Sequence, residues 1–232
     1  MLDQALAALK TFDWGADLAP LKPIEEAVVA THGDAAARQK LESQLTEILK
    51  SDAPRAAKDY VCRVLMQIGS ADSVPTLAAL LASPELSHMA RFALYRIPAP
   101  ASASALREAA GKLTGEQKIG VIATLGARGD NESVAMLGQL LGDADAETAR
   151  AAAMALGAIR SGTAAQVLTK AKPSDKGVQA AVIDAALACA EGLVADGKKA
   201  AALAIYKSYA GEGQPKHVRL AATRGMLAAA GK

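Results

Sequence analysis

Five leucines recur at almost constant spacing along the middle of this chain, and this repeat constrains the fold more than any other feature. Intervals of 29, 31, 31 and 31 residues separate the repeat leucines, which are Leu65, Leu94, Leu125, Leu156 and Leu187. Around each of them, apolar residues fall four positions before, one before and three after, except for Thr124 and Arg128 around Leu125. This spacing is one face of an α-helix. The repeat therefore predicts five equivalent helices.

A second apolar stretch follows several of these helices after a short break. Val74 and Val134 begin two such stretches, and they are 60 residues apart, like the corresponding repeat leucines Leu65 and Leu125. Glycine, aspartate, asparagine and proline fill the breaks, as is typical of helix caps and turns. Each unit is therefore predicted to be a helical hairpin, which buries its apolar face by stacking on its neighbours.

The composition agrees with an all-α chain. Alanine and leucine, the strongest helix formers, account for 56 and 27 of the 232 residues, while aromatic residues make up 3%. β-Branched and aromatic residues, which a sheet requires, are scarce. An all-β fold is excluded.

One of the repeat segments resembles a known family. The residues Ala149-Arg-Ala-Ala-Ala-Met-Ala-Leu-Gly-Ala-Ile159, followed by a turn and a second apolar helix, resemble the HEAT repeat. The similarity is to the short form of the repeat found in HEAT-like proteins, including the phycobilisome lyases. The resemblance spans residues 53–172 and implies a right-handed α-solenoid, an α-α superhelix of stacked hairpins. The chain departs from the pattern at Pro98 and Pro100, and at Arg160.

We expect a single α-solenoid domain over residues 1–232, with atypical capping helices at both ends. Residues 1–33 form the N-terminal cap and first helix, 34–172 the HEAT-like repeats, and 173–232 the last repeats and C-terminal cap. The first hairpin is predicted to pair helices over 22–31 and 34–50, with Phe12 and Trp14 lying over it. The longer C-terminal hairpin is expected to be a cap, with a tetratricopeptide-like pair as the alternative.

Charge and hydropathy restrict the partners. The net charge is +2, from 26 basic and 24 acidic residues that are interspersed along the chain. Since nucleic-acid binders usually present a basic face or run, no nucleic acid is expected. No signal peptide is recognised, and Asp184 and Glu191 interrupt the longest apolar stretch, 177–195, so no membrane span is expected. The localisation is unknown and is taken as cytoplasmic by default.

The sequence contains no motif that indicates catalysis, a cofactor or a metal site. His32, His88 and His217 lack ligand partners at helical spacing, and no nucleotide-binding, hydrolase or zinc-protease motif occurs. Cys62 and Cys189 lie inside apolar helical stretches and are expected to be buried hydrophobic residues. A bilin-lyase-like enzyme or a HEAT-like DNA glycosylase would need polar, basic or aromatic clusters that the sequence does not show. We therefore expect a chain that is not an enzyme.

Binding is the function that the sequence favours. In HEAT-like arrays the second helices line the concave face, and their non-core positions form the usual partner surface. Carried over to this chain, the resemblance implies a protein or peptide partner, or another domain of the same polypeptide, bound by a monomer. The predicted contact residues are Thr76, Arg107, Met136, Gln139, Gln166 and Lys170. The alternative is a structural spacer or adaptor domain without a specific groove.

Overall fold

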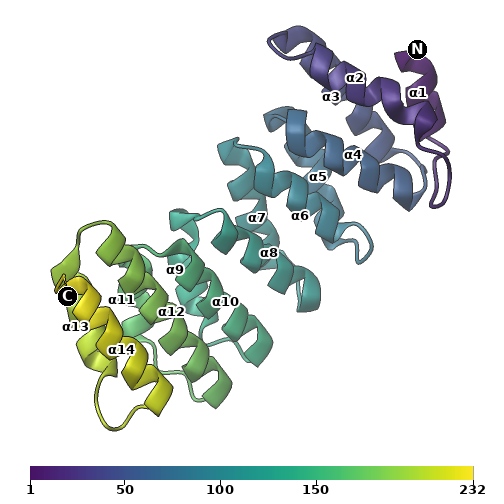
Figure 1. The fold of residues 1–232 in the computed structure, drawn as a ribbon. Coiled ribbons are helices and arrows are strands. Elements are labelled where there is room, and N and C mark those ends of the chain that lie inside the picture. Colours follow the sequence, from purple (N-terminus) through teal and green to yellow (C-terminus); the bar gives the residue numbers. More distant parts are fainter. Residues whose placement is uncertain (232) are drawn as a thin grey trace. The chain divides into compact units, whose positions relative to one another are not determined.

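The computed structural model describes residues 1–231, and this part of the chain is all α-helical apart from turns and short 3-10 segments. It divides into two compact units, Met1–Val121 and Ile122–Lys232, with the boundary inside α8. Within each unit, helices that follow one another in sequence pack side by side, as in a HEAT-like α-solenoid (Figure 1). The predicted all-α, HEAT-like fold class is confirmed.

The first unit contains α1 to α7 and most of α8. The helices are α1 (Leu2–Leu9), α2 (Lys22–Ala30), α3 (Ala35–Lys50), α4 (Arg55–Ile68), α5 (Val74–Ala79), α6 (Ser87–Arg96), α7 (Pro100–Lys112) and α8 (Gly115–Ala127). The 3-10 segments are η1 (Ala19–Leu21), η2 (Ala71–Ser73) and η3 (Leu80–Ala82). The predicted helices over 22–31 and 34–50 correspond to α2 and α3, so the first hairpin is confirmed.

The second unit begins within α8. After η4 (Asn131–Ser133) its helices are α9 (Val134–Leu140), α10 (Ala146–Ile159), α11 (Gly162–Lys170), α12 (Lys176–Ala195), α13 (Lys199–Tyr209) and α14 (Lys216–Ala229). Helix α12 lies at the centre of this unit and contacts α10, α11, α13 and α14.

The repeat leucines are the core of the first helix of each hairpin. They lie on α4, α6, α8, α10 and α12, and each is buried, with at most 8% of its surface exposed at Leu187. The apolar residues Leu77, Leu137 and Leu168 of three second helices are fully buried as well. The predicted register is therefore confirmed in the five first helices and in these three second helices.

Small residues bring consecutive first helices close together in the second unit. A Cβ atom at Gly126 would lie 2.6 Å from the Cα of Ala155, and one at Gly157 would lie 2.9 Å from the Cα of Ala185. Real Cβ atoms do not approach a backbone this closely, so no side chain fits at either glycine. Glycine at these positions lets the backbones of α8 and α10, and of α10 and α12, pack directly against each other.

Two turns show how the hairpins are joined. The carboxylate of Glu42 on α3 is buried and accepts hydrogen bonds from the backbone N–H groups of Ser70 and Ser73, at 2.7 and 3.1 Å. It thereby caps η2 together with Oγ of Ser70, which accepts a hydrogen bond from the N–H of Asp72 at 3.1 Å. Arg160 ends α10 in the left-handed region at φ 55°, and it is the one non-glycine residue there among residues 1–231. Glycine is the usual residue in this conformation, and nothing in the structure explains the arginine.

The expected role of Trp14 is wrong. Its side chain is 63% exposed, in the turn between α1 and α2, and it covers no core face. Phe12 is half-buried instead, with its ring 6.4 Å from that of Tyr60 on α4. At the C-terminus, Leu227 is 49% exposed, and α14 turns Val218, Ala222 and Ala229 inward.

Helix α12 corrects a second expectation. By length and composition it is apolar enough to cross a bilayer, although Asp184 and Glu191 interrupt it. The core helix of a packed helical array has the same composition, and α12 buries eight residues, including Leu187 and Cys189, against its neighbours. Its hydropathy reflects this central position in the second unit.

Candidate functional site

The six predicted contact residues all lie on second helices, outside the buried core. Gln139 on α9 and Gln166 and Lys170 on α11 are exposed, whereas Thr76 on α5, Arg107 on α7 and Met136 on α9 are half-buried. This placement follows directly from the helical register. Their role in binding stays a prediction.

The second unit brings two of these residues together at one hollow. Gln166 and Lys170 line an open depression of about 380 Å³ between the start of α9 and the face of α11. The other lining residues are Asn131, Glu132, Val134 and Ala135 from η4 and α9, and Thr163 and Val167 from α11. Met136 and Gln139 do not line this hollow. Thr76 and Arg107 belong to the first unit, on the neighbouring helices α5 and α7.

Local packing determines the shape of this hollow. A Cβ atom at Gly138 would lie 2.7 Å from Cγ1 of Val167, so α9 and α11 approach closely at that point. Ser161 caps α11, since its Oγ accepts a hydrogen bond from the N–H of Ala164 at 3.2 Å. These contacts hold α11 so that Thr163, Gln166 and Lys170 face the same opening.

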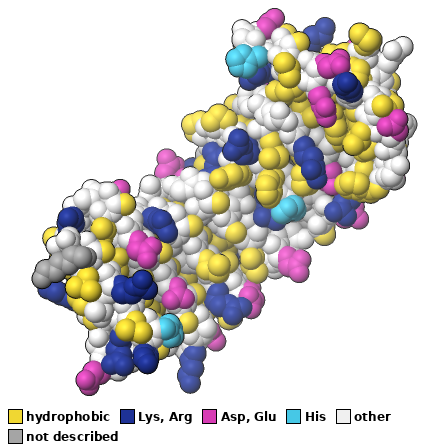
Figure 2. All heavy atoms as spheres, viewed as in Figure 1, with side chains coloured by type: hydrophobic (Ala, Val, Ile, Leu, Met, Phe, Trp, Pro, Cys, Tyr) yellow, Lys and Arg dark blue, Asp and Glu magenta, His cyan; other side chains and the backbone are white. Residues whose placement is uncertain are grey.

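A larger groove lies on the first helices of the first unit, and the sequence did not predict it. Its volume is about 990 Å³, and it runs between α4 and α6. Helix α4 contributes Arg63, Met66 and Gln67, and α6 contributes His88, Met89, Phe92, Tyr95 and Arg96. Figure 2 shows hydrophobic and basic side chains gathered over α4 and α6, around a histidine. We call it the α4–α6 groove.

Two aromatic side chains make this groove distinctive. Phe92 and Tyr95 are 46% and 41% exposed, although large apolar side chains are usually buried. They flank the buried repeat leucine Leu94, at positions where the α10 helix has Met154 and Gly157. The signal in the sequence was this pair of aromatic residues in a chain with only 3% aromatic content.

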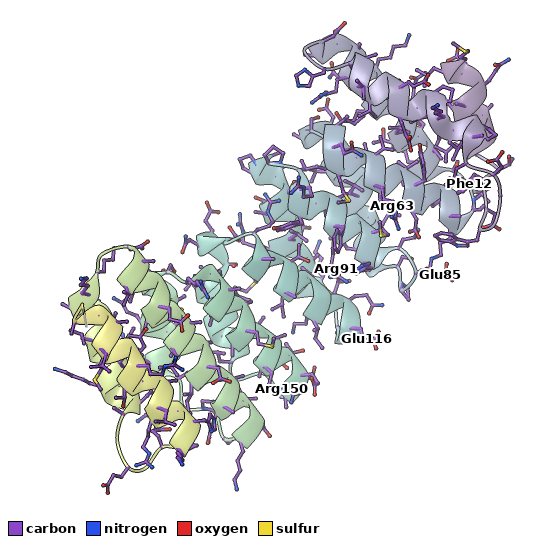
Figure 3. The ribbon with its side chains drawn as sticks, viewed as in Figure 1. Phe12, Arg63, Glu85, Arg91, Glu116 and Arg150 are labelled. Atoms are coloured by element: carbon purple, nitrogen blue, oxygen red, sulfur yellow. The ribbon has the colours of Figure 1, made fainter. Side chains whose placement is uncertain are left out.

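Arg91, which is not among the residues that line the groove, joins α6 to α8. Its guanidinium donates a hydrogen bond to the carbonyl oxygen of Gly120 at 3.0 Å, and it lies 3.5 Å from Nδ1 of His88. Burial lowers the pKa of Arg91. The ring of His88 in turn lies 5.0 Å from that of Phe92. Arg91 and Arg63 are labelled in Figure 3, on α6 and α4 respectively.

Several titratable side chains of residues 1–231 are buried and have shifted pKa values. Within residues 1–231, no group of three or more histidine, cysteine, aspartate or glutamate side chains is placed to hold a metal ion. Cys62 and Cys189 are fully buried free thiols, as expected, and burial raises their pKa values to about 12 and about 11. Burial also raises the pKa of Asp59, despite the opposing charges of Arg55 and Arg63.

Comparison with known proteins identifies part of the chain. No curated protein sequence matches it. Among solved structures, the crystal structure of an engineered protein is similar, with 19% sequence identity and a TM-score of 0.46 over 90% of this chain and 97% of that one. Residues 114–187 match the family model for HEAT repeats. This segment, from the start of α8 into α12, is therefore a HEAT repeat region.

Proposed function

We propose that the chain is a non-catalytic protein-interaction module, which holds a protein or peptide partner on the second helices of its hairpins. Stacked helical repeats present extended surfaces on which partners bind, and residues 114–187 are a region of this kind. The partner is a separate protein or another domain of the same polypeptide. The contact surface that we propose is formed by α9 and α11.

The hollow beside Gln166 and Lys170 is the observation that carries this proposal. These two side chains are exposed, while Ala164, Ala165 and Leu168 of the same helix are buried and hold it in the core. The buried face of α11 therefore packs in the core, while its polar face is free to contact a partner. Ala135 and the glycine at 138 keep the neighbouring surface of α9 low, so that a peptide backbone could approach it closely.

The mixed character of the hollow favours a protein over a polyanion. Its lining contains one acidic residue, Glu132, and one basic residue, Lys170, together with the amides of Asn131 and Gln166. Amide side chains both donate and accept hydrogen bonds, which suits the backbone and side chains of a peptide. A phosphate polymer would require several positive charges instead.

A capture experiment tests the proposal. The purified chain is used as bait in a lysate of its source, beside the double variant Gln166→Ala/Lys170→Glu and the control Arg224→Glu, and captured proteins are read by mass spectrometry. Arg224 is exposed on α14, so its reversal changes the net charge equally without touching the hollow. We expect a protein that wild type and the control capture and the double variant loses. Equal capture by all three, or none, contradicts the proposal and favours a structural spacer.

A further inference from the structure

The α4–α6 groove is a second surface, on different helices and in a different unit from the α9–α11 hollow. Its lining comes from two first helices, α4 and α6, which contact each other. At about 990 Å³ it exceeds the α9–α11 hollow, at about 380 Å³. The inference drawn from it does not rest on the proposed function.

The groove presents apolar anchors along two helical turns. Residues 88, 89, 92, 95 and 96 lie on one face of α6, and they span about 12 Å of helix. Phe92 and Tyr95 form one wall, and Met66 and Met89 supply flexible, polarisable side chains between the helices. Helices that bind in such grooves use anchors at positions i, i+3, i+4 and i+7, which cover the same length.

The charge of the groove has one sign. Arg63 and Arg96 lie at its edges, and none of its eight lining residues is acidic, although the whole chain has a net charge of only +2. Neither arginine forms a salt bridge with a carboxylate of residues 1–231. The acidic residues closest in sequence to the lining are Asp59, which is buried on α4, and Glu85, in the turn before α6. Both lie outside the lining.

Contacts of Arg91 and His88 hold α6 and the ring of Phe92 in place. Arg91 is hydrogen bonded to the backbone of α8, and its guanidinium packs against Gly120, which leaves no room for a side chain there. His88 packs against Phe92 and so restricts the aromatic ring that a ligand would contact. A wall that is already ordered costs less entropy on binding than a flexible one.

We propose that the α4–α6 groove binds an acidic amphipathic helix of a partner protein. The apolar face of that helix would lie against Met66, Met89 and Phe92, and its carboxylates would pair with Arg63 and Arg96. Carboxylates complement arginine by charge-assisted hydrogen bonds, while the apolar anchors supply the area that stabilises a helix in a groove.

Nucleic acid also binds arginine and aromatic side chains, but the groove fits it less well. Single-stranded nucleic acids are bound by extended basic channels, whereas Arg63 and Arg96 are the two arginines of this lining. Two methionines between the helices suit aliphatic side chains better than bases. A competing oligonucleotide therefore becomes one arm of the test.

Fluorescence anisotropy on the full chain measures the binding directly. The probe is a labelled designed helix with leucine at i, i+3, i+4 and i+7 and glutamate elsewhere, and a second peptide replaces each glutamate with lysine. We expect saturable binding of the acidic peptide, weakened by added salt, and at least tenfold weaker binding of the basic one. We expect the variant Phe92→Ala and the double variant Arg63→Glu/Arg96→Glu each to weaken binding of the acidic peptide at least tenfold.

Three controls make the result decisive. Lys40→Glu, at an exposed position of α3 in the same unit, and Arg224→Glu, at an exposed position of α14 in the other unit, should each leave the affinity for the acidic peptide within twofold. Thermal unfolding confirms that each variant is folded. Three results would overturn the proposal. They are equal affinity for both peptides, a loss of affinity in the Lys40→Glu control as large as in the groove variants, and displacement of the peptide by an oligonucleotide at the same concentration.

Discussion

The helix pair α4–α6 in the first unit and the pair α10–α12 in the second follow the same repeat, yet they present different surfaces. The position after the repeat leucine is Met66 on α4 and Tyr95 on α6, but Gly126 on α8 and Gly157 on α10. In the second unit the glycines let the helix backbones pack closely, since a Cβ atom at Gly157 would lie 2.9 Å from the Cα of Ala185. In the first unit the larger side chains line an open groove. The repeat determines which residues are buried, and the size of one residue beside the leucine decides whether the outer face closes.

The largest expected loss of stability comes from placing a large side chain at Gly157, where α10 packs closely on α12. Gly157→Leu places a side chain against the Cα of Ala185, with no space to receive it. Because the obstacle is backbone, we expect a loss of about 3 kcal/mol or more in the free energy of unfolding, at the upper end of overpacking effects. Urea unfolding followed by circular dichroism measures the loss.

The matched control for this variant is Met66→Leu at the equivalent position of α4. Methionine and leucine have similar volumes, so this exchange should cost less than about 1.5 kcal/mol. Similar losses for the two variants would show that the α10–α12 pair is not closed by its glycine.

A smaller effect is expected from alanine at the same position. Gly157→Ala improves helix propensity by up to about 1 kcal/mol, but its Cβ meets Ala185 at 2.9 Å, and we expect a net destabilisation of about 1 kcal/mol. Gly111→Ala on α7 meets nothing within 4 Å and should instead stabilise by about 0.5–1 kcal/mol. Chemical denaturation of both variants provides the comparison. Stabilisation by both would contradict the close approach.

The α4–α6 pair also buries a carboxylate, and its stability should depend on pH accordingly. Burial raises the pKa of Asp59, so the folded protein holds this proton more tightly than the unfolded chain does. The tighter proton binding by Asp59 therefore contributes to the free energy of unfolding below the ordinary pKa of aspartate. This contribution is lost as the pH rises through the raised pKa. Relative to wild type, Asp59→Asn should become more stable over that rise.

Denaturant unfolding of both proteins from pH 4 to pH 7 checks this expectation, with Asp52→Asn, an exposed carboxylate before α4, as the control for loss of a charge. A difference between Asp59→Asn and wild type that stays constant with pH would show that Asp59 titrates alike in the folded and unfolded chains.

The smallest expected signal comes from the two thiols, one in each pair. Cys62 on α4 and Cys189 on α12 are fully buried, and their raised pKa values of about 12 and about 11 keep them protonated at pH 8. We expect almost no reaction with a disulfide reagent at pH 8 until denaturant is added. Rapid labelling of Cys62 alone would mean that the core around α4 opens readily.

The sequence predicted the buried part of this fold because burial leaves a periodic pattern. The repeat leucines, the first hairpin and the second helices follow from the spacing of apolar residues. Trp14 was misplaced because a single aromatic residue in a turn belongs to no period. The groove beside Phe92 and Tyr95 was missed for the same reason, since periodicity identifies the residues that face the core and carries no information about the shape of the outer surface.

Methionine methyl NMR tests the comparison between the two pairs most directly. The chain has six methionines, with Met66 and Met89 in the α4–α6 groove, Met136 on α9, and Met154 exposed on α10. Titration of methyl-labelled protein with the acidic amphipathic peptide should shift the signals of Met66 and Met89 and leave those of Met136 and Met154 unchanged. Equal shifts at Met154, or none at Met66 and Met89 under saturating peptide, would contradict an open groove confined to the first pair.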